Sequence, residues 1–510
     1  MRIGSVPLRI VIVGGGTAGW MAANLMAQRW RERNVEIALL ESPEIGIVGV
    51  GEGSTPLLGT FFEKLGIADA EWMPRCNATY KNGIRFAGWS RQPGFESYFH
   101  PFASAIDIHA QAAFFLHCAL RRNGYDVPVT PDRFYIAAEL ARQRLAPLAA
   151  HHFPFRIFHG YHFDAHLVGA LLGEHAQRLG VTHLQGKVVA VERSEGGDVA
   201  AVRTEDGRRI EGDFFVDCSG FRSLIVQQAL GVPFRSFADN LFNDAAAVLP
   251  TPPDPTGTAS QTVSTALDNG WVWNIPLRHR HGNGYVYSTR FCTPEMAERE
   301  LRTHLGLLDA PVEARHLRMR VGRVERPWAH NCLAVGLSQG FIEPLEATAL
   351  HLVQTTVESF IEQAEREGDP DARRQTFNEG IARDFEGVRD YIVCHYRMNR
   401  RGDTDYWRAN ASHDQLSDSL KAILTCWFTG QNLEREIARQ GIGDIYPPLS
   451  WHCLLAGYGQ FPDPDKLRAP EPGIGVADIA AIDDFRTRCA LNFRDHRELL
   501  AATWQPVGLE

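Results

Sequence analysis

Residues 8–41 read LRIVIVGGGTAGWMAANLMAQRWRERNVEIALLE, and the architecture of the chain follows from this stretch. Its first six residues are mostly apolar and β-branched, which predicts a strand. Three glycines come next, and the alanines and the leucine after them favour a helix. A second strand-like run begins after Asn34 and ends in Glu41. Strand, turn, helix and strand in this order form a βαβ unit, which predicts a parallel sheet covered by helices.

A G-x-G-x-x-G motif lies directly between the predicted strand and helix, and the residues expected at its turn are Gly14, Gly16, Thr17, Ala18 and Gly19. Glycines permit a tight turn and close backbone approach, so a pyrophosphate can lie at the positive end of the helix. Glu41 ends the next strand and is placed to accept hydrogen bonds from ribose hydroxyls. The motif therefore predicts a dinucleotide site. The alternative is a glycine-rich turn with the same sequence pattern that binds no ligand.

The motif alone does not separate FAD from NAD. Two later segments, DFFVDCSG at 213–220 and NCLAVGLSQGF at 331–341, predict further strands that end in small-residue turns. In flavoprotein hydroxylases, strands at these positions in the sequence pack next to FAD. A simple NAD dehydrogenase does not need these additional strands. We therefore expect FAD, with Val188 and Gly336 among the residues around it.

Beyond the nucleotide motif, the middle of the chain is β-rich and its end is helical. WVWNIPL and YVYSTRF predict strands between about 240 and 290, whereas helical periodicity dominates beyond residue 370. We predict an α/β fold with an FAD-binding, doubly wound core of the Rossmann-like, hydroxylase type, β-rich insertions and a mostly α-helical C-terminal lobe. The expected division is an interleaved core over 1–365 and a helical lobe over 366–510 that completes the substrate pocket.

Composition narrows the class of partner. Hydrophobic residues at 44% and charged residues at 22% are typical of globular proteins. The formal charge of −9 is modest and no block of like charge appears, so nucleic acid is not expected. Three glycines interrupt the apolar stretch 10–27, which favours strand, turn and helix over a signal peptide or membrane helix. The nine cysteines are scattered without a CxxC pair, which favours reduced thiols, a cytoplasmic protein and no metal site.

Several motifs, in their order along the chain, resemble those of the flavin-dependent tryptophan and indole halogenases. They are VGEGSTP at 50–56, TYKNGIRFAGW at 79–89, YHFDAHL at 161–167, DCSGFRS at 217–223, WVWNIP at 271–276, FIEPLEATAL at 341–350, and HY followed by DYW at 395–396 and 405–407. The resemblance runs over most of the chain. It implies an enzyme that uses reduced FAD, oxygen and chloride or bromide to halogenate an electron-rich, indole-type ring through hypohalous acid.

Two residues carry the implied chemistry. Lys81 matches the family's essential lysine, although spacing alone would place it on an exposed strand edge. The resemblance implies that hypohalous acid reaches its ammonium group, and a partly desolvated lysine can act as a proton donor or a nucleophile. Glu346 is the implied acid–base partner, and without the resemblance it would be a first-turn glutamate favoured by the helix dipole. Glu343 lies nearby, but the family match favours Glu346.

Thr348 and Ala349 fall where the family binds halide, with backbone N–H groups at a helix start. The family commonly has serine, threonine and glycine after the glutamate, whereas this chain has Ala347, Thr348 and Ala349. Because this departure changes the halide pocket, we hypothesise that bromide is accepted at least as readily as chloride.

The resemblance implies aromatic residues around the flavin and around the organic substrate. Trp271 and Trp273 point the same way from one strand and could be core residues. The resemblance places them near the flavin, where their bulk keeps the organic substrate away from it. His100, Phe102 and Trp451 lie in segments that resemble the family's ring-clamping positions, and flat apolar walls suit an aromatic substrate.

The resemblance also implies partners. No second complete G-x-G-x-x-G is present for a nicotinamide cofactor, so a separate NADH-dependent flavin reductase is expected to supply reduced FAD. A homodimer is expected from the family, and no membrane partner is expected. Tryptophan-specific members carry paired tyrosines where this chain has Tyr446 followed by prolines, so an indole or a larger indole-bearing or phenolic molecule is as well supported as free tryptophan. An aromatic hydroxylase and a non-catalytic flavin-binding protein remain as alternatives.

Overall fold

The computed structural model describes residues 7–46, 49 and 51–503. Val50, which opens the VGEGSTP motif, lies outside the described residues. A six-stranded sheet forms the nucleotide-binding half, and its strands run in the order β21 (Trp328–Ala329), β22 (Cys332–Ala334), β13 (Phe214–Asp217), β1 (Leu8–Val13), β2 (Val35–Glu41) and β9 (Thr182–Gln185).

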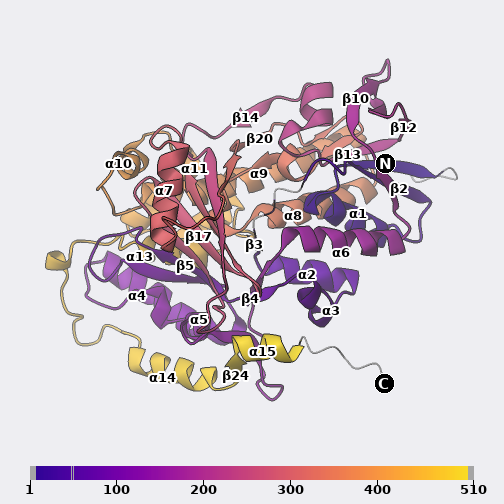
Figure 1. The fold of residues 1–510 in the computed structure, drawn as a ribbon. Helices are drawn as coiled ribbons and strands as arrows, with labels where there is room; N and C mark the ends of the chain where they lie inside the picture. Colours follow the sequence, from indigo (N-terminus) through magenta and orange to yellow (C-terminus); the bar gives the residue numbers. More distant parts are fainter. Residues whose placement is uncertain (1–6, 47–48, 50, 504–510) are drawn as a thin grey trace.

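All pairs in this sheet are parallel except the one between β21 and β22. Three helices pack together beside it, namely α1 (Thr17–Arg29), α6 (Ala165–Arg178) and α8 (Ala349–Glu365), as Figure 1 shows. The predicted βαβ opening is confirmed. The two later returns are confirmed as well, because β13 pairs with β1 and β22 pairs with β13.

A seven-stranded sheet forms the second half, in the order β19 (Arg315–Arg318), β15 (Ala245–Thr251), β18 (His281–Tyr287), β17 (Gly270–Pro276), β16 (Thr262–Ala266), β5 (Gly83–Ala87) and β6 (Ser97–Pro101). Its pairs are antiparallel except β16 with β5. Helix α7 (Pro294–Leu305) packs against β15 and β18. The β-rich insertions are therefore one continuous sheet, and WVWNIP lies on its strand β17.

A three-stranded antiparallel sheet joins three distant segments of the chain. Its strands are β3 (Glu52–Gly53), β8 (Gly160–Phe163) and β4 (Thr79–Lys81), with β8 in the middle. Strand β4 leads directly into β5 of the large sheet. In Figure 1, β3 and β4 lie centrally, between the two large sheets.

The remaining elements surround these sheets. Smaller sheets contain β10 (Val188–Arg193), β11 (Val199–Thr204), β12 (Arg209–Glu211), β14 (Phe234–Ser236), β20 (Gly322–Val324) and β23 (Gly340–Phe341). Four further helices precede residue 150, namely α2 (Leu57–Leu65), α3 (Asp69–Arg75), α4 (Ile108–Arg122) and α5 (Ile136–Arg142).

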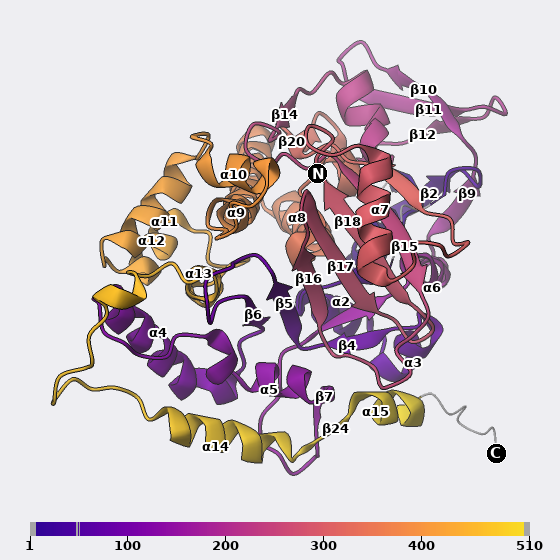
Figure 2. The same cartoon turned by 60° about the vertical axis from the view of Figure 1, so that its left-hand side comes forward.

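The C-terminal part is mostly helical, as predicted. Its helices are α9 (Pro370–Arg397), α10 (Asp405–Ser412), α11 (Asp418–Phe428), α12 (Leu433–Gln440), α13 (Pro448–Gly457), α14 (Ile479–Ala490) and α15 (His496–Thr503). Figure 2 shows α10 to α13 gathered on one side, with α4 beside them.

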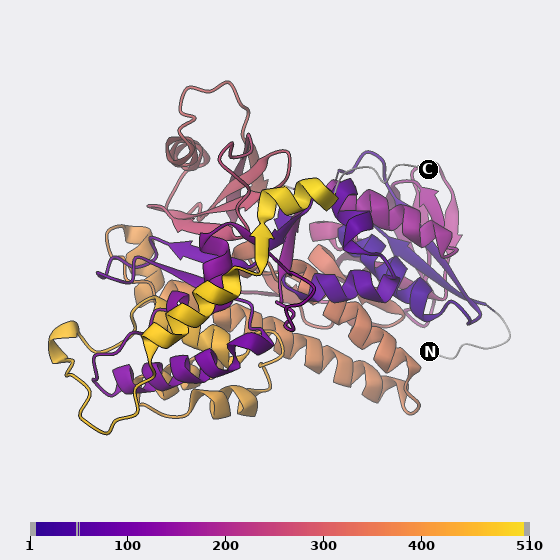
Figure 3. The same cartoon turned by 90° about the horizontal axis from the view of Figure 1, so that it is seen from below.

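The C-terminal part is nevertheless interleaved with the N-terminal half. Helix α13 packs on β6, and β24 (Phe493–Asp495) pairs with β7 (Leu145–Ala149). Figure 3, the view from below, shows the yellow helices α14 and α15 crossing the face of the molecule that is turned toward the viewer. The division at residue 365 stays a prediction. Among the described residues, no helix has both the length and the apolar character needed to span a membrane.

Candidate active site

The turn after β1 is packed so closely that it needs glycine. Gly14 has φ +117°, and a Cβ atom there would lie 2.1 Å from the carbonyl oxygen of Cys218. A Cβ on Gly19 would lie 1.9 Å from the carbonyl oxygen of Gly14. These two glycines let β1, β13 and α1 meet at one point.

Gly16 differs from its neighbours. A Cβ there would meet nothing within 4 Å, and Gly16 provides no side-chain cap for α1. Glycine has no side chain that could accept a hydrogen bond from the first backbone N–H groups of α1. The space where a side chain of residue 16 would lie is open. A pyrophosphate fits this cradle because free N–H groups and the helix dipole both favour an anion.

Glu41 lies beside the same turn, at the end of β2. A Cβ on Gly15 would come 1.6 Å from Glu41 Oε2, so the carboxylate lies directly over the bare backbone of the turn. His183 from β9 holds it, with Nε2 2.7 Å from Glu41 Oε1. The sequence predicted the place of Glu41 but gave no signal for His183, which the register of β2 and β9 brings alongside.

The other predicted cofactor residues lie at different distances from this turn. Gly336 has φ +69°, and a Cβ there would lie 2.7 Å from the Cβ of Ala18, so the turn after β22 touches the start of α1. Val188 begins β10 and is buried in an apolar cluster with Val13 and Leu40. Its contact with a cofactor stays a prediction. The glycine cradle, the carboxylate and the return of β22 together fit FAD.

Lys81 ends β4 and is fully buried. Its Cα partner across the strand pair is Gly160, whose missing side chain lets the carbonyl of Ser54 approach, since a Cβ on Gly160 would lie 2.4 Å from that oxygen. Lys81 Nζ donates a hydrogen bond to this carbonyl at 3.1 Å. Burial lowers the pKa of Lys81 to about 8, although the nearby Glu346 carboxylate acts to raise it. The expectation of an exposed strand edge, drawn from spacing alone, is wrong because β8 and the large sheet cover this strand.

Glu346 ends a short 3₁₀ helix, Pro344–Glu346, just before α8, and is buried. His100 Nδ1 lies 3.2 Å from each carboxylate oxygen, and His395 Nε2 lies 3.0 Å from Oε1. Burial acts to raise the pKa of Glu346, but the charge and hydrogen bonds of His100 and then His395 outweigh it and bring the pKa to about 2. Glu346 is therefore a carboxylate at neutral pH.

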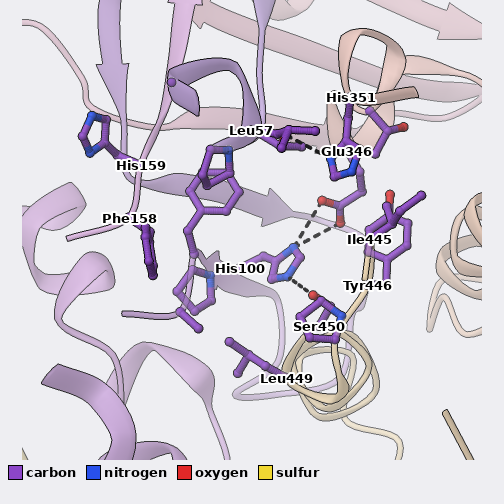
Figure 4. A pocket seen from close by; sticks show the side chains of 18 of the residues that line it. Leu57, His100, Phe158, His159, Glu346, His351, Ile445, Tyr446, Leu449 and Ser450 are labelled. Atoms are coloured by element: carbon purple, nitrogen blue, oxygen red, sulfur yellow. Dashed lines mark hydrogen bonds and ion pairs between the residues drawn. The ribbon is translucent and has the colours of Figure 1, made fainter. Parts of the chain in front are cut away.

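Each histidine has a second partner that orients its ring. His100 Nε2 lies 3.1 Å from Ser450 Oγ, and His395 Nδ1 lies 2.8 Å from the Tyr458 hydroxyl. Figure 4 shows His100 between Glu346 and Ser450. Because a carboxylate only accepts hydrogen bonds, each histidine donates one ring N–H to Glu346 and faces a hydroxyl with its other ring nitrogen.

A cavity of about 420 Å³ opens beside this carboxylate. Of the predicted site residues, His100, Phe102, Glu346 and Thr348 line it, together with apolar side chains such as Leu57, Phe158 and Ile445. Phe102 also contacts the lysine, since Lys81 Nζ lies 5.6 Å from the centre of its ring. Figure 4 shows the cavity side chains converging around His100 and Glu346.

Trp451 does not line this cavity. Its side chain is fully buried and meets Tyr391 edge-on at 5.0 Å between ring centres, while the preceding residues Leu449 and Ser450 face the cavity. A helix turns by about 100° per residue, so the next residue of α13 points elsewhere. The prediction of Trp451 as a substrate contact is therefore corrected to a residue behind the cavity wall.

Sequence reasoning missed His351 and gave Tyr446 no place in the cavity wall. His351 Nδ1 lies 3.1 Å from Thr55 Oγ1, and burial lowers its pKa to about 4, so it is neutral. Tyr446 lies on Tyr391 with ring centres 3.7 Å apart. A histidine one turn into a predicted helix carried no signal of its own. In the sequence, Tyr446 stood out only as a single tyrosine followed by prolines.

Trp271 and Trp273 are both buried on β17, with ring centres 6.1 Å apart. Trp271 Nε1 donates to Glu343 Oε2 at 3.3 Å. Glu343 also accepts from Asn243 Nδ2 at 2.8 Å and from the hydroxyl of Tyr396. Burial raises the pKa of Glu343 to about 7. Glu343 thus belongs to a network behind the tryptophans, distinct from the histidine-bound Glu346.

The predicted halide residues lie at the start of α8. Thr348 is the N-terminal cap residue, is buried and makes no side-chain cap bond, while Ala349 is exposed. Ala347 before them has φ +58°. Halide binding here stays a prediction.

The fold and site together define a dinucleotide-binding protein with a buried lysine and a buried carboxylate near one apolar cavity. The tryptophan halogenase family model matches residues 9–471. The tryptophan 6-halogenase of Streptomyces toxytricini is 36% identical over 94% of this chain and 93% of its own, and its crystal structure superposes with a TM-score of 0.85, covering 97% and 99% of the two chains. The tryptophan 7-halogenase of Lentzea aerocolonigenes is 34% identical over 91% of each chain.

A flavin-dependent halogenase from Brevundimonas sp. BAL3 is also similar in structure. Its TM-score is 0.83 at 34% identity, covering 97% of this chain and 99% of that one. The chain belongs to the tryptophan halogenase family. It is a flavin-dependent halogenase.

Proposed function

We propose that this enzyme halogenates an electron-rich, indole-type ring with hypohalous acid directed by Lys81 and with Glu346 as the base. The observation that carries the proposal is that a buried carboxylate lines an apolar cavity and a buried ammonium contacts Phe102, another residue of its wall. When bound, reduced FAD supplies with oxygen and a halide ion the oxidising power that makes hypohalous acid.

The two side chains have complementary roles in this proposal. Lys81 donates one N–H to the Ser54 carbonyl and keeps others to hydrogen-bond the oxygen of hypohalous acid, which makes the halogen more electrophilic. When the halogen bonds to the ring, this oxygen leaves as water with a proton from the ammonium, and Glu346 later returns a proton to Lys81. The Glu346 carboxylate stabilises the positive charge that develops on the ring and takes the proton that the new carbon–halogen bond displaces. His100 and His395 keep Glu346 ionised until that moment.

The cavity supports an aromatic substrate. Leu57, Phe102, Phe158, Ile445 and Tyr446 supply apolar and flat walls. Relatives are named as halogenases of tryptophan, so the substrate proposed here carries an indole, as free tryptophan or within a larger molecule. We further propose that bromide is accepted at least as readily as chloride, at a halide site formed by Thr348 and Ala349.

Four further properties belong to the same proposal. A separate NADH-dependent reductase supplies reduced FAD, and the enzyme is a homodimer. A cytoplasmic address is supported by its nine free cysteines, all but one of them buried. The proposed lobe boundary at residue 365 is supported by the helical run from α9 to α13, which contributes Leu449 and Ser450 to the cavity.

Mass spectrometry of products tests this function. The protein is incubated with FAD, a flavin reductase, NADH, oxygen, bromide and an indole, beside Lys81→Ala. A bromine isotope pattern present with the parent enzyme and lost in Lys81→Ala supports the proposal. A hydroxylated product that survives Lys81→Ala would point to an aromatic hydroxylase, and FAD binding without any product across indoles and phenols would point to a non-catalytic flavoprotein.

A further inference from the structure

Lys81 ends the edge strand of a three-stranded sheet. In the order β3, β8 and β4, strand β8 pairs with only one side of β4, so the backbone groups on the outer side of β4 need partners from elsewhere. The ammonium of Lys81 serves the proposed reaction only if this strand is held in place, because a displacement of about 1 Å at a reacting group can cost about a hundredfold in rate.

Helix α15, near the end of the chain, supplies one of these partners. Its first residue, His496, is fully buried. His496 Nε2 accepts a hydrogen bond from the backbone N–H of Tyr80, the residue before Lys81, at 3.1 Å. The ring proton is therefore on Nδ1, which donates to the carbonyl of Thr258 at 3.2 Å. Burial lowers the pKa of His496 to about 4, so the ring is neutral at ordinary pH.

The backbone on the other side of Lys81 is held by the same outer segment. The backbone N–H of Asn82 donates to the carbonyl of Ser260 at 2.7 Å, and Asn82 Nδ2 donates to Ser260 Oγ at 2.9 Å. Thr258, the partner of His496, lies two residues before Ser260. One short segment of the chain is thus joined to both flanks of Lys81, to one of them through the histidine ring.

Two strands fix the position of His496 in turn. The residue before it, Asp495, is paired with Leu145 of β7, and the backbone N–H of His496 donates to the carbonyl of Arg144 at 2.9 Å. The carbonyl of Leu145 also accepts from Asn82 Nδ2 at 3.0 Å. Figures 1 and 2 both show α15 close to β4. Strand β7, strand β24 and α15 therefore form a support behind the strand that carries the lysine.

We propose that His496 is a positioning residue for Lys81. It binds the backbone N–H of Tyr80 and thereby fixes the strand from which the ammonium group acts. His496 does not line the cavity of about 420 Å³, so its effect on the reaction passes through Lys81 and not through the substrate. This assignment rests on the proposed function and adds to it a residue from the opposite end of the chain.

Two substitutions separate the two ring nitrogens of His496. His496→Asn keeps an N–H donor near the position of Nδ1, for Thr258, but has no atom at the position of Nε2. His496→Gln is one carbon longer and brings an amide oxygen to the N–H of Tyr80. The first variant therefore loses the bond to β4, and the second restores an acceptor for it.

His117 on α4 provides a matched control. It is also fully buried, its Nδ1 donates to the carbonyl of Pro128 at 2.8 Å, and its Nε2 accepts from the backbone N–H of Ala477 at 3.1 Å. Burial lowers the pKa of this histidine as well. His117 does not line the cavity. His117→Asn thus removes the same kind of hydrogen bond at a place that does not hold Lys81.

The melting temperature and FAD affinity are measured for the three variants. In reactions with bromide and indole, the brominated indole and the free hypobromous acid captured by a dimedone-type trap are measured together. The ratio of these two products does not depend on how much of the protein is folded, so a change in stability alone leaves it unchanged. It reports how well Lys81 passes the oxidant to the ring.

His496→Asn is expected to lower this ratio about tenfold or more, with the KM for indole within about twofold of the parent, because only the position of Lys81 changes. His496→Gln should bring the ratio back to within about threefold of the parent. His117→Asn should lower the melting temperature by a similar amount to His496→Asn and keep the parent ratio, since each loses one buried hydrogen bond.

A ratio in His496→Asn as high as that in His117→Asn would overturn the assignment, and so would a ratio in His496→Gln as low as that in His496→Asn. If His496→Asn does not fold, His496→Met takes its place, because methionine has the length of glutamine but no amide oxygen. Absence of brominated indole with the parent enzyme would instead defeat the proposed function.

Discussion

His100 Nδ1 lies 3.2 Å from both carboxylate oxygens of Glu346, so one imidazole N–H is shared across the base of the proposed reaction. The opposite nitrogen of His100 faces Ser450, and the ring also lines the substrate cavity. His100 is thus tied to the catalytic carboxylate rather than free to follow the substrate ring.

Acid stability should report on Glu346. Its pKa in the folded protein, about 2, lies below the ordinary value of 4.5, so its contribution to stability is present above about pH 4.5 and is lost as the pH falls toward 2. The difference in free energy of unfolding between the parent and Glu346→Gln should shrink by about 3 kcal/mol across that window. Denaturant titrations at several pH values measure it, and a constant difference would contradict the assigned ionisation.

The pH dependence of halogenation should report on Lys81. Its pKa is lowered to about 8 by burial, and the proposed role requires the ammonium form. The rate of halogenation should therefore fall as the pH rises through about 8. Rates measured with reduced FAD supplied in excess check this. A rate that rises through the same range would mean that the free amine is the active form, as a nucleophile that takes the halogen.

Replacing His395 should weaken catalysis without changing the cavity wall. His395 is fully buried between Glu346 and Tyr458 and does not line the cavity. His395→Phe should lower kcat at least about tenfold and leave the KM for indole nearly unchanged, because it removes a charge-assisted hydrogen bond from the base. Tyr458→Phe, which removes the second hydrogen-bond partner of His395 and does not alter the cavity wall, serves as the milder comparison. A large increase in KM with unchanged kcat would contradict this role.

Two glycine substitutions should separate folding from cofactor binding. Gly14→Ala places a Cβ 2.1 Å from a carbonyl oxygen at φ +117° and should cost about 3 kcal/mol of stability or more. Gly16→Ala meets no protein atom within 4 Å, so the melting temperature without FAD should stay the same. FAD affinity, measured by quenching of flavin fluorescence, should nevertheless fall in Gly16→Ala. Unchanged affinity would place the pyrophosphate elsewhere.

Phe102 and Trp451 should behave differently despite their similar place in the sequence prediction. Phe102 lines the cavity, so Phe102→Ala should raise the KM for indole. Trp451→Phe leaves the cavity wall in place and should lower the melting temperature while the KM stays within about twofold, as expected of a core substitution. Steady-state kinetics and thermal unfolding of both variants distinguish the two positions.

The nucleotide half of the fold was predictable because its signals are local. Gly14 and Gly19 must be glycines for the chain to pass between β1, β13 and α1, and the apolar runs around them have the periods of a strand and a helix. Motifs quoted in order were enough to recognise the family, and with it the importance of Lys81 and Glu346. Trp451 was misplaced because motif similarity gives a neighbourhood, whereas the turn of a helix decides which of two adjacent residues faces the cavity.

Local patterns of the chain determine the βαβ opening and the dinucleotide turn, and the resemblance of its motifs to a family singles out the two reactive residues. The ionisation of these two residues, by contrast, depends on the tertiary structure. Lys81 loses solvent because β8 and the large sheet cover β4, and Glu346 stays ionised because His100 and His395 arrive from segments 246 and 49 residues away. Burial and hydrogen bonding between distant segments set these pKa values, and such contacts exist only once the chain has folded.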